Sequence, residues 1–342
     1  AKVAERLEPY WKSLEQDMQG VALLGDFPQR IYDRVMAYGE LLSSTLLDAY
    51  LQLLGVETAW LDARQLILTD SQWRQARVMW PETENRLSQA IRPALENNQV
   101  VITQGYIGAN SDGVTTTLGR EGSDYTAALA ARALAAKQLT LWKDVPGVMT
   151  ADPRYTTNPK VMPQLNYSQA AELTFYGASV LHPNTLRPLR EAYIPLQVRS
   201  FLEPDKAGTL IAERGPAQLP AITLYKFKQA LIQIQPTEFT YLPASMLQQV
   251  FDELAHMGIQ VNLMQRQATS LSLVVDAMED LQTLLQGKLS GQSSIEVREN
   301  LLLETRINHP QDTVPVIPPP LLEQHSGALW QRVLNTSADV AG

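Results

Sequence analysis

Short apolar runs alternate with longer stretches of helical spacing through the first 211 residues of the chain. "ELLSSTLLDAYLQLL" (40–54) has the apolar spacing of an amphipathic helix and stops at Gly55, whereas "VVIT" (100–103) is typical of a buried strand. The predicted helices are 40–54, 124–137, 168–177 and 184–192, and the predicted strands are 56–62, 100–103, 139–142 and 194–201. Because helices alternate with apolar strands, the sequence predicts an α/β sheet with several parallel neighbours.

The pattern changes after Ile211, where "ERGPAQLPA" (213–221) is typical of a linker. The elements predicted beyond it are strand 230–235, helix 245–257, strands 259–264 and 270–276, helix 278–289 and strand 294–298. This βαββαβ order is that of a ferredoxin-like unit. We therefore expect a first domain at 1–213, a linker at 214–221 and a second domain at 222–342.

Six apolar side chains recur at helical spacing in the first helix of the βαββαβ unit and are predicted to pack on its sheet. They are Met246, Leu247, Val250, Phe251, Leu254 and Met257. "LLLETRI" (301–307) predicts a further strand, whereas "PQDTVPVIPPP" (310–320) is incompatible with a helix or a central strand. "LLEQH" (321–325) and "LWQRVL" (329–334) are expected to add edge strands.

Composition and charge limit the possible partners. The net charge of −8 argues against nucleic acid, which calls for a basic surface. The chain has no cysteine, and its four histidines show no metal-binding spacing, so we predict no protein-bound metal site. No apolar run has the length of a membrane span, and the first residues lack a signal-peptide core. We expect a cytoplasmic protein with no membrane partner, and further residues upstream because the first residue is Ala.

The stretch "TTTLGREGSDYTAALAARAL" (115–134) leads from glycines into an alanine-rich helix that Ser123 is predicted to cap. A helix N-terminus carries unpaired N–H groups and a partial positive charge, so it favours an anion. Arg120 adds a planar fork suited to a carboxylate or phosphate, and Asp124 can orient a cation. The open alternative is a capped helix with a surface arginine.

"WKDVPGVMTADPR" (142–154) leaves the end of a predicted strand, where α/β proteins place their ligands. Lys143 and Arg154 suit phosphate, and Asp144 suits a ribose hydroxyl, a base or a metal-bound water. Together they suit a nucleotide with its magnesium, although a solvated charged loop is the alternative. The P-loop and protein-kinase signatures are absent, and His182 is expected to be structural.

The chain resembles the aspartokinase family of the amino acid kinase superfamily in several ordered motifs. The matching stretches are "YGELLSSTLL", "TTTLGREGSDYTAALAARAL", "WKDVPGVMTADPR", "AAELTFYGASVLHPNTLRPL" and "IPLQVRSFLEPDKAGTLI". The resemblance runs from about 31 to 211 and implies a mainly parallel sheet between helical layers. It also implies MgATP-dependent phosphorylation of the side-chain carboxylate of L-aspartate. The βαββαβ unit would be a complete ACT regulatory unit at about 225–300, with a shortened second one after 300, and a homodimer would be expected.

The resemblance also assigns roles to individual residues. Glu40 would hold the substrate amino group, and Arg120 would bind its α-carboxylate. Ser123 and Asp124 would lie at the reacting end, with Asp124 organising a phosphate-binding lysine. The residues implied to contact the nucleotide are Lys143, Asp144, Met149, Arg154 and Ser179, and those implied to be catalytic are Arg120, Asp124 and Lys143.

The first departure from the family is the missing "KFGGTS" segment, which does not occur between Ala1 and Ile31. We expect it upstream of residue 1. The alternatives are a catalytically inactive regulatory paralogue, or the front part of a bifunctional kinase–dehydrogenase. A kinase for another acid, such as acetylglutamate, is disfavoured because an acylated nitrogen needs no carboxylate such as that of Glu40.

Three further departures concern single positions of the kinase region. A nucleotide-contacting lysine of the family is Ser179 here, and we expect Lys143, which replaces a threonine, to supply the lost charge. A tyrosine of the family is Met149, which predicts apolar packing against adenine. Glu121 replaces a small or neutral residue, and because it would repel aspartate we expect it to turn away and pair with a nearby cation.

The last departure lies in the ACT region. The candidate effector residues Ser245, Met246, Leu247 and Asn262 differ from those of lysine-sensitive relatives. The carboxylate that would pair with an amino-acid ammonium is lost at Asn262. The resemblance therefore implies an amino-acid effector site without identifying the effector.

Overall fold

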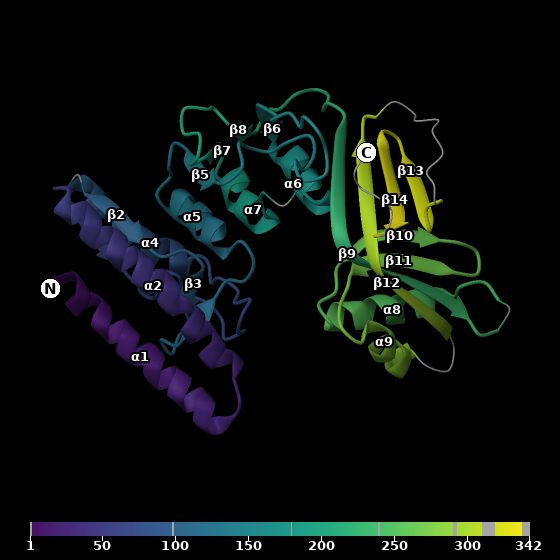
Figure 1. The fold of residues 1–342 in the computed structure, drawn as a ribbon, viewed down its shortest axis with the longest axis horizontal. Helices are drawn as coiled ribbons and strands as arrows, with labels where there is room; N and C mark the ends of the chain where they lie inside the picture. Colours follow the sequence, from purple (N-terminus) through teal and green to yellow (C-terminus); the bar gives the residue numbers. More distant parts are fainter. Residues whose placement is uncertain are drawn as a thin grey trace. The chain divides into compact units, whose positions relative to one another are not determined.

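The computed structural model describes residues 2–97, 99–178, 180–238, 240–289, 293–309 and 319–336 (Figure 1). The chain divides into two compact units. The first unit comprises Ala1–Val145, Gln164–Ala171 and Leu181–Gly215, and the second comprises Pro146–Pro163, Glu172–Val180 and Pro216–Gly342. The second unit thus takes in two segments of the N-terminal half. Within the described residues, no helix combines the length and the apolar character needed to cross a membrane.

The first unit is a mixed α/β structure. Its helices are α1 (Lys2–Leu24), α2 (Gln29–Leu53), α3 (Ala63–Leu66), α4 (Glu82–Glu96), α5 (Gly122–Ala133) and α7 (Pro183–Glu191). Its strands are β1 (Thr58–Leu61), β2 (Val100–Thr103), β3 (Ile107–Ala109), β4 (Thr115–Thr117), β5 (Leu139–Lys143), β6 (Gln164–Asn166), β7 (Leu196–Ser200) and β8 (Thr209–Ala212). The pairs β1–β2, β5–β7 and β6–β8 are parallel, and β3–β4 and β7–β8 are antiparallel. The predicted α/β class with parallel neighbours is confirmed.

The first two helices run side by side (Figure 1). Arg34 of α2 forms an ion pair with Asp17 of α1, whose carboxylate also accepts a hydrogen bond from the Tyr38 hydroxyl at 2.9 Å. α2 begins at Gln29 rather than at residue 40, because its buried stripe extends upstream through Ala37 and Asp33. An acid on an apolar stripe concealed this extension from the sequence pattern.

The start of α5 differs from the prediction. Its first helical residue is Gly122, and Glu121 occupies the N-cap position in a left-handed conformation with φ 54° and ψ 27°. Ser123 therefore lies inside the first turn, and its predicted capping role is wrong. The helix ends at Ala133 rather than at residue 137, since Ala135 is itself left-handed, with φ 50°.

The second unit contains one antiparallel sheet covered by two helices. The elements are β9 (Ile222–Pro236), α8 (Ala244–His256), β10 (Val261–Arg266), β11 (Leu271–Asp276), α9 (Leu281–Leu289), β12 (Ser293–Ile307), β13 (Leu322–Ser326) and β14 (Leu329–Asn335), with α6 (Tyr167–Tyr176) running into it from the first unit. The strand order is β10-β11-β9-β12-β14-β13. The order β12-β9-β11-β10 of the first four strands gives the βαββαβ segment its ferredoxin-like arrangement.

Three details of the second unit correct the sequence predictions. β12 is one strand with a bulge between Arg298 and Leu301, where two strands were expected. β13 is an edge strand as predicted, but β14 lies between β12 and β13. Met246 packs in the core of the α8 stripe as expected, whereas Phe251 is 38% exposed. Most of the segment 310–320 lies outside the described residues.

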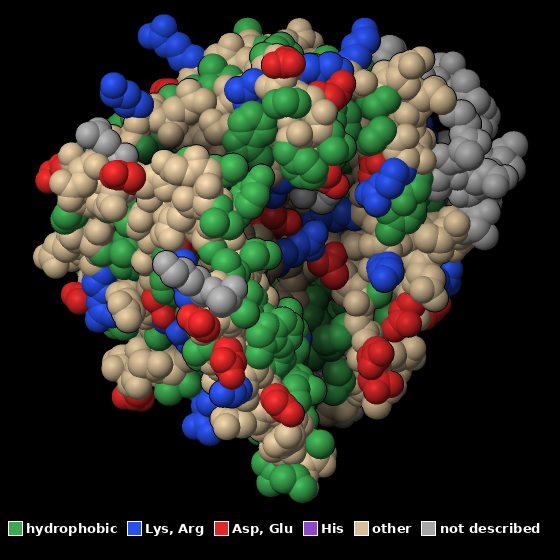
Figure 2. All heavy atoms as spheres, turned by 60° about the vertical axis from the view of Figure 1, so that its left-hand side comes forward, with side chains coloured by type: hydrophobic (Ala, Val, Ile, Leu, Met, Phe, Trp, Pro, Cys, Tyr) green, Lys and Arg blue, Asp and Glu red, His purple; other side chains and the backbone are tan. Residues whose placement is uncertain are grey.

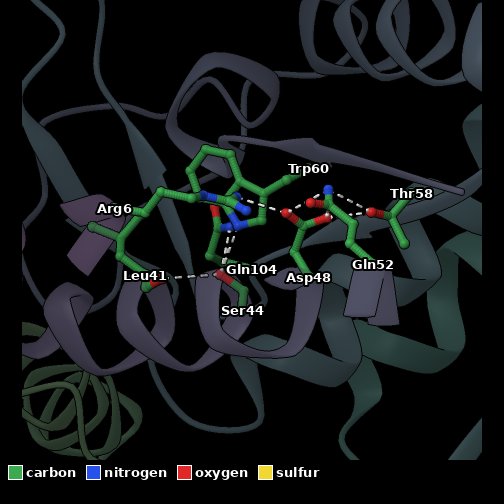
Figure 3. Close-up of polar contacts among 8 residues, drawn as sticks. All are labelled: Arg6, Leu41, Ser44, Asp48, Gln52, Thr58, Trp60 and Gln104. Atoms are coloured by element: carbon green, nitrogen blue, oxygen red, sulfur yellow. Dashed lines mark hydrogen bonds and ion pairs between the residues drawn. The ribbon is translucent and has the colours of Figure 1, made fainter. Parts of the chain in front are cut away.

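A buried carboxylate on α2 holds the helix against β1 (Figure 3). Asp48 is 1% exposed and accepts hydrogen bonds from Arg6 of α1 at 2.6 Å and from the Thr58 hydroxyl of β1 at 2.5 Å. The Gln52 side chain donates to both of its oxygens, at 3.3 and 3.2 Å. One acid therefore fixes α2 between a helix and a strand, because a buried carboxylate is stable only when its oxygens are satisfied.

A second polar contact on α2 fixes its rotation (Figure 3). The Ser44 hydroxyl accepts hydrogen bonds from the Gln104 amide at 2.8 Å and from the Trp60 indole at 3.1 Å. The Gln104 side-chain oxygen in turn accepts from the backbone N–H of Ala63 at 2.8 Å. These bonds orient the face of α2 that also carries Glu40, one turn before Ser44.

We predict that Asp48→Ala lowers the free energy of unfolding by about 2 kcal/mol, because three donors lose a buried acceptor. The control Arg6→Ala is expected to cost about 1 kcal/mol or less, since the Arg6 side chain is 38% exposed. Urea denaturation followed by circular dichroism measures both variants. Equal losses would show that the ion pair, rather than the buried hydrogen bonds, stabilises this junction.

Candidate functional site

Asp33 of α2 is a fully buried carboxylate that links three segments of the first unit. Its oxygens accept the backbone N–H of Arg74 at 2.9 and 3.0 Å, the backbone N–H of Thr117 at 2.9 Å and the Thr117 hydroxyl at 3.0 Å. Thr117 ends β4, the strand that leads to Gly119 and Arg120. Asp33 therefore fixes the Arg74 loop and the approach to α5 in one arrangement.

A cavity of about 600 Å³ opens beside these segments. It is lined by Gln29, Tyr32, Gln72, Trp73, Arg74, Gln75, Tyr106, Gly119 and Arg120. Both charged residues in this lining are arginines. On the face shown in Figure 2, Lys and Arg side chains are interspersed with Asp and Glu. The described lining of the cavity offers positive charge alone, which favours an anionic ligand.

Two glycines permit close backbone approaches around this cavity. Gly119 has φ +76°, and a Cβ built on it would lie 3.1 Å from the carbonyl oxygen of Arg74. A Cβ on Gly105 would lie 2.7 Å from the Cα of Ser123. Side chains at these two positions would push Arg74 and Ser123 away. The predicted substrate residue Ser123 is therefore packed against the backbone at Gly105.

The first turn of α5 and the end of β5 form a cluster of three charged side chains. The Lys143 ammonium donates to Asp124 at 2.6 Å and to Glu121 at 3.2 Å. Asp124 is 9% exposed. The pairing of Glu121 with a nearby cation was expected, and the cation is Lys143. Two carboxylates share one ammonium, so the cluster carries one net negative charge when all three groups are ionised.

This sharing shifts two pKa values. Burial raises the pKa of the Asp124 carboxyl above 3.8, the Lys143 ammonium opposes that rise, and the neighbouring Glu121 adds to it. Burial alone would lower the pKa of the Lys143 ammonium, but the hydrogen bond and charge of Asp124, with the charge of Glu121, raise it above 10.5. Lys143 therefore stays protonated at neutral pH.

Glu40 and His182, both singled out from the sequence, lie on α2 and directly before α7. Glu40 is half-buried on α2, and burial raises the pKa of its carboxyl. His182 precedes α7, and its Nδ1 accepts the backbone N–H of Asn184 at 3.2 Å. Burial, followed by the positive charge of Arg120, lowers the pKa of the His182 imidazole. Glu40 is not among the residues that line the 600 Å³ cavity.

The predicted nucleotide residues fall in both units. Asp144 is exposed directly after β5 in the first unit. Met149 and Arg154 belong to the second unit, where Met149 forms an isolated antiparallel bridge with Val161. The Arg154 guanidinium pairs with Asp152 at 2.6 Å, and its side chain is 72% exposed. Ser179 lies outside the described residues, so its predicted role stays a prediction.

The predicted effector residues have different environments in the second unit. Ser245 is exposed in the first turn of α8, Met246 is 8% exposed in the core, and Leu247 packs partly against it. Asn262 is 5% exposed, accepts from the Lys226 ammonium at 2.8 Å and donates to Gln229 at 2.8 Å. Its side chain is therefore fully engaged within the sheet.

Sequence reasoning missed Asp33, Arg74 and Tyr106. Asp33 precedes the buried Ala37 and Leu41 at four-residue intervals, so an acid on the apolar stripe was the signal available. Arg74 and Tyr106 adopt left-handed conformations with φ 68° and 71°. Neither residue is a glycine or asparagine, so the residue types did not indicate this conformation. Their positions follow from tertiary contacts.

No group of three or more His, Cys, Asp or Glu able to hold a metal ion occurs in the part of the chain that the structure describes.

Comparison with known proteins identifies the family. The model of the amino acid kinase family matches residues 4–200. The chain belongs to the amino acid kinase family. Among curated family members, it is 35% identical to lysine-sensitive aspartokinase 3 of Escherichia coli (strain K12) over 81% of this chain and 63% of that protein. It is 32% identical to the chloroplastic aspartokinase 1 of Arabidopsis thaliana over 78% of this chain and 48% of that one.

Solved structures agree with the family assignment. The chain superposes on E. coli aspartokinase III in complex with aspartate and ADP with a TM-score of 0.85 and 29% identity, covering 97% of this chain and 78% of that one. The complex of the same enzyme with lysine and aspartate gives a TM-score of 0.77, covering 99% and 79%. The chain spans 63% of the length of the E. coli relative and 48% of the length of the Arabidopsis relative.

We predict that two substitutions shift the pKa of Asp124 in opposite directions. Lys143→Met should raise it, because burial and Glu121 remain while the opposing ammonium is gone. Glu121→Gln should lower it, since one source of repulsion is removed. ¹³C NMR titration of the labelled Asp carboxyls measures both. Shifts of the same sign would contradict the three-charge cluster.

Proposed function

We propose that this protein is an aspartate kinase, which transfers the γ-phosphoryl group of MgATP to the side-chain carboxylate of L-aspartate. The products would be 4-phospho-L-aspartate and ADP, in the first step toward lysine, threonine and methionine. The observation that carries the proposal is the Lys143 ammonium held by Asp124 and Glu121 at the first turn of α5, directly after Arg120. The likeness to an aspartokinase solved with aspartate and ADP supports the substrate and the nucleotide.

The residues of the first unit suit the two ends of aspartate. Arg120, in the cavity wall, presents a guanidinium fork that binds a carboxylate through two parallel hydrogen bonds. Glu40 carries the negative charge that the substrate ammonium requires. Ser123 and Asp124, in the first turn of α5, would flank the reacting carboxylate, where the helix N-terminus stabilises negative charge.

The transfer step requires no nucleophilic side chain. A side-chain carboxylate oxygen of aspartate forms a bond to the γ-phosphorus while the bond from that phosphorus to the β–γ bridging oxygen breaks. The electron pair leaves with ADP, and no proton moves because the attacking carboxylate is already ionised. Catalysis then consists of positioning and charge stabilisation, and the Lys143 ammonium stabilises charge on the transferring phosphoryl group.

Lys143 would supply a positive charge that the family pattern places on another residue. Asp124 fixes its ammonium, and the raised pKa keeps it charged. It would thus supply positive charge to the phosphates of the nucleotide. Asp144 offers one exposed carboxylate, which fits magnesium because that ion binds through one or two carboxylates and the nucleotide's phosphates. Bound magnesium neutralises phosphate charge.

We further infer a cytoplasmic homodimer with an amino-acid effector site in the second unit. The ferredoxin-like sheet supports the regulatory role, and so does the structure of the E. coli relative in complex with lysine and aspartate. The division into kinase region 1–213, linker 214–221 and regulatory region 222–342 belongs to the same proposal. Of the predicted effector residues, Ser245 and Leu247 remain the candidates for effector contacts, because Met246 lies in the core and the Asn262 amide is fully engaged within the sheet.

We predict phosphoryl transfer from MgATP to L-aspartate by the full-length protein, measured by trapping the acyl phosphate as its hydroxamate. Lys143→Met should lower kcat about 100-fold or more, the size expected for losing one preorganised charge at the transferring group. Lys137→Met, a control at an exposed lysine after α5, should leave kcat unchanged. An active Lys143→Met variant would overturn the role of Lys143, and an inactive wild-type protein would overturn the proposed function.

Two substitutions next to each other should have opposite outcomes for substrate binding. Arg120→Lys should raise the KM for aspartate about tenfold, because an ammonium cannot form the bidentate pair. Glu121→Gln should change that KM by less than about twofold, since Glu121 faces Lys143. A large fall in KM for Glu121→Gln would show that its carboxylate repels the substrate directly.

A further inference from the structure

Arg74 combines a strained backbone with a side chain that lines the 600 Å³ cavity. Its backbone is left-handed, with φ 68°, a conformation that is unfavourable for a residue with a Cβ. Such strain persists only where the surrounding structure enforces it, and it concentrates at binding and catalytic sites. The enforcement is visible here, because both oxygens of the buried Asp33 hold the Arg74 N–H.

The side chain of Arg74 is presented to the cavity. Its guanidinium carbon lies 4.7 Å from the ring centroid of Tyr32, and both residues line the 600 Å³ cavity. A cation held over an aromatic face keeps its N–H edge available for a ligand. Among the described residues, no carboxylate forms an ion pair with the Arg74 guanidinium, and the residue is exposed.

The charge of the cavity is unbalanced. Arg74 and Arg120 line it, and none of its described lining residues is Asp or Glu. The two arginines come from segments in close contact, because the carbonyl oxygen of Arg74 approaches Gly119, the residue before Arg120. An ionised carboxylate has about four lone-pair sites on two oxygens, so one carboxylate can accept from two guanidinium groups.

We infer that Arg74 is a second arginine for the α-carboxylate of the amino-acid substrate and that it determines specificity together with Arg120. This inference rests on the proposed aspartate kinase function. Asp33 enforces the left-handed turn at Arg74, and this turn places the second guanidinium in the cavity wall. None of the described residues that line the cavity is an acid that would compete for that guanidinium. The substrate α-carboxylate is therefore bound by two cations, and a ligand whose α-carboxylate is replaced by a neutral amide loses both.

The test compares Arg74→Ala with Arg74→Gly in the full-length protein. Both variants remove the guanidinium, but glycine also relieves the left-handed strain. Isothermal titration calorimetry with L-aspartate should show a Kd about tenfold higher for both variants, the size expected for losing one charge-assisted hydrogen bond. The melting temperature of Arg74→Gly should nonetheless equal or exceed that of the wild-type protein. Arg74→Lys should recover part of the affinity.

A matched ligand separates a binding role from a structural one. L-isoasparagine, the α-amide of aspartate, keeps the amino group and the side-chain carboxylate. Its Kd should be the same for the wild-type protein and for Arg74→Gly. Equal losses for both ligands, an unchanged Kd for aspartate, or a loss confined to ATP would each overturn the inference.

The hydroxamate assay run in parallel keeps the two proposals apart. An active enzyme whose Arg74→Gly variant binds aspartate as tightly as the wild-type protein would overturn the role of Arg74 and leave the kinase function standing. A wild-type protein that neither binds nor phosphorylates aspartate would overturn both.

Discussion

The buried carboxylate of Asp33 is the constraint on which the part of the first unit around Arg74 and Arg120 depends. It anchors the Arg74 loop and the end of β4 to α2, so three segments far apart in sequence share one acceptor. Each donor is a backbone N–H or a hydroxyl, and a buried carboxylate is tolerated only when its lone pairs are satisfied in this way. The geometry of Arg120 follows from this anchor, because β4 leads directly into it.

The charge arrangement at α5 places an acid next to a helix N-terminus without leaving that acid unpaired. Glu121 replaces a neutral residue of the family pattern, and its left-handed N-cap position faces it toward Lys143 rather than leaving it unpaired. Asp124 shares the same ammonium. The extra acid and the extra lysine therefore offset each other within one cluster, and the Arg120 side of the helix N-terminus keeps its positive character.

The sequence predicted what depends on local periodicity. The strand at 100–103 and the order of elements in the βαββαβ unit follow from apolar spacing and from glycine and proline stops, and they agree with β2 and with β9 through β12. The sequence also predicted that Glu121 pairs with a nearby cation, which is Lys143, whereas the predicted role of Lys143 toward the nucleotide stays a prediction. The partners of Asp33 and Arg74 could not be predicted, since the hydrogen bond between them joins positions 41 residues apart in the chain. The left-handed Glu121 is likewise set by tertiary contacts, and this is why the start of α5 was placed wrongly.

The six-stranded sheet of the second unit offers a parallel to the cluster at α5. Asn262 occupies the position of a family carboxylate, and its amide nitrogen donates to Asp276 at 2.9 Å while its oxygen accepts from Lys226 at 2.8 Å. A carboxylate at this position could not donate to Asp276 and would meet it as a like charge in a buried setting. The neutral amide is therefore the chemistry that the surrounding sheet requires. In each unit, a residue whose charge differs from the family pattern is bonded to its immediate neighbours: Glu121 to Lys143, and Asn262 to Lys226 and Asp276. These departures from the family pattern are therefore accommodated locally.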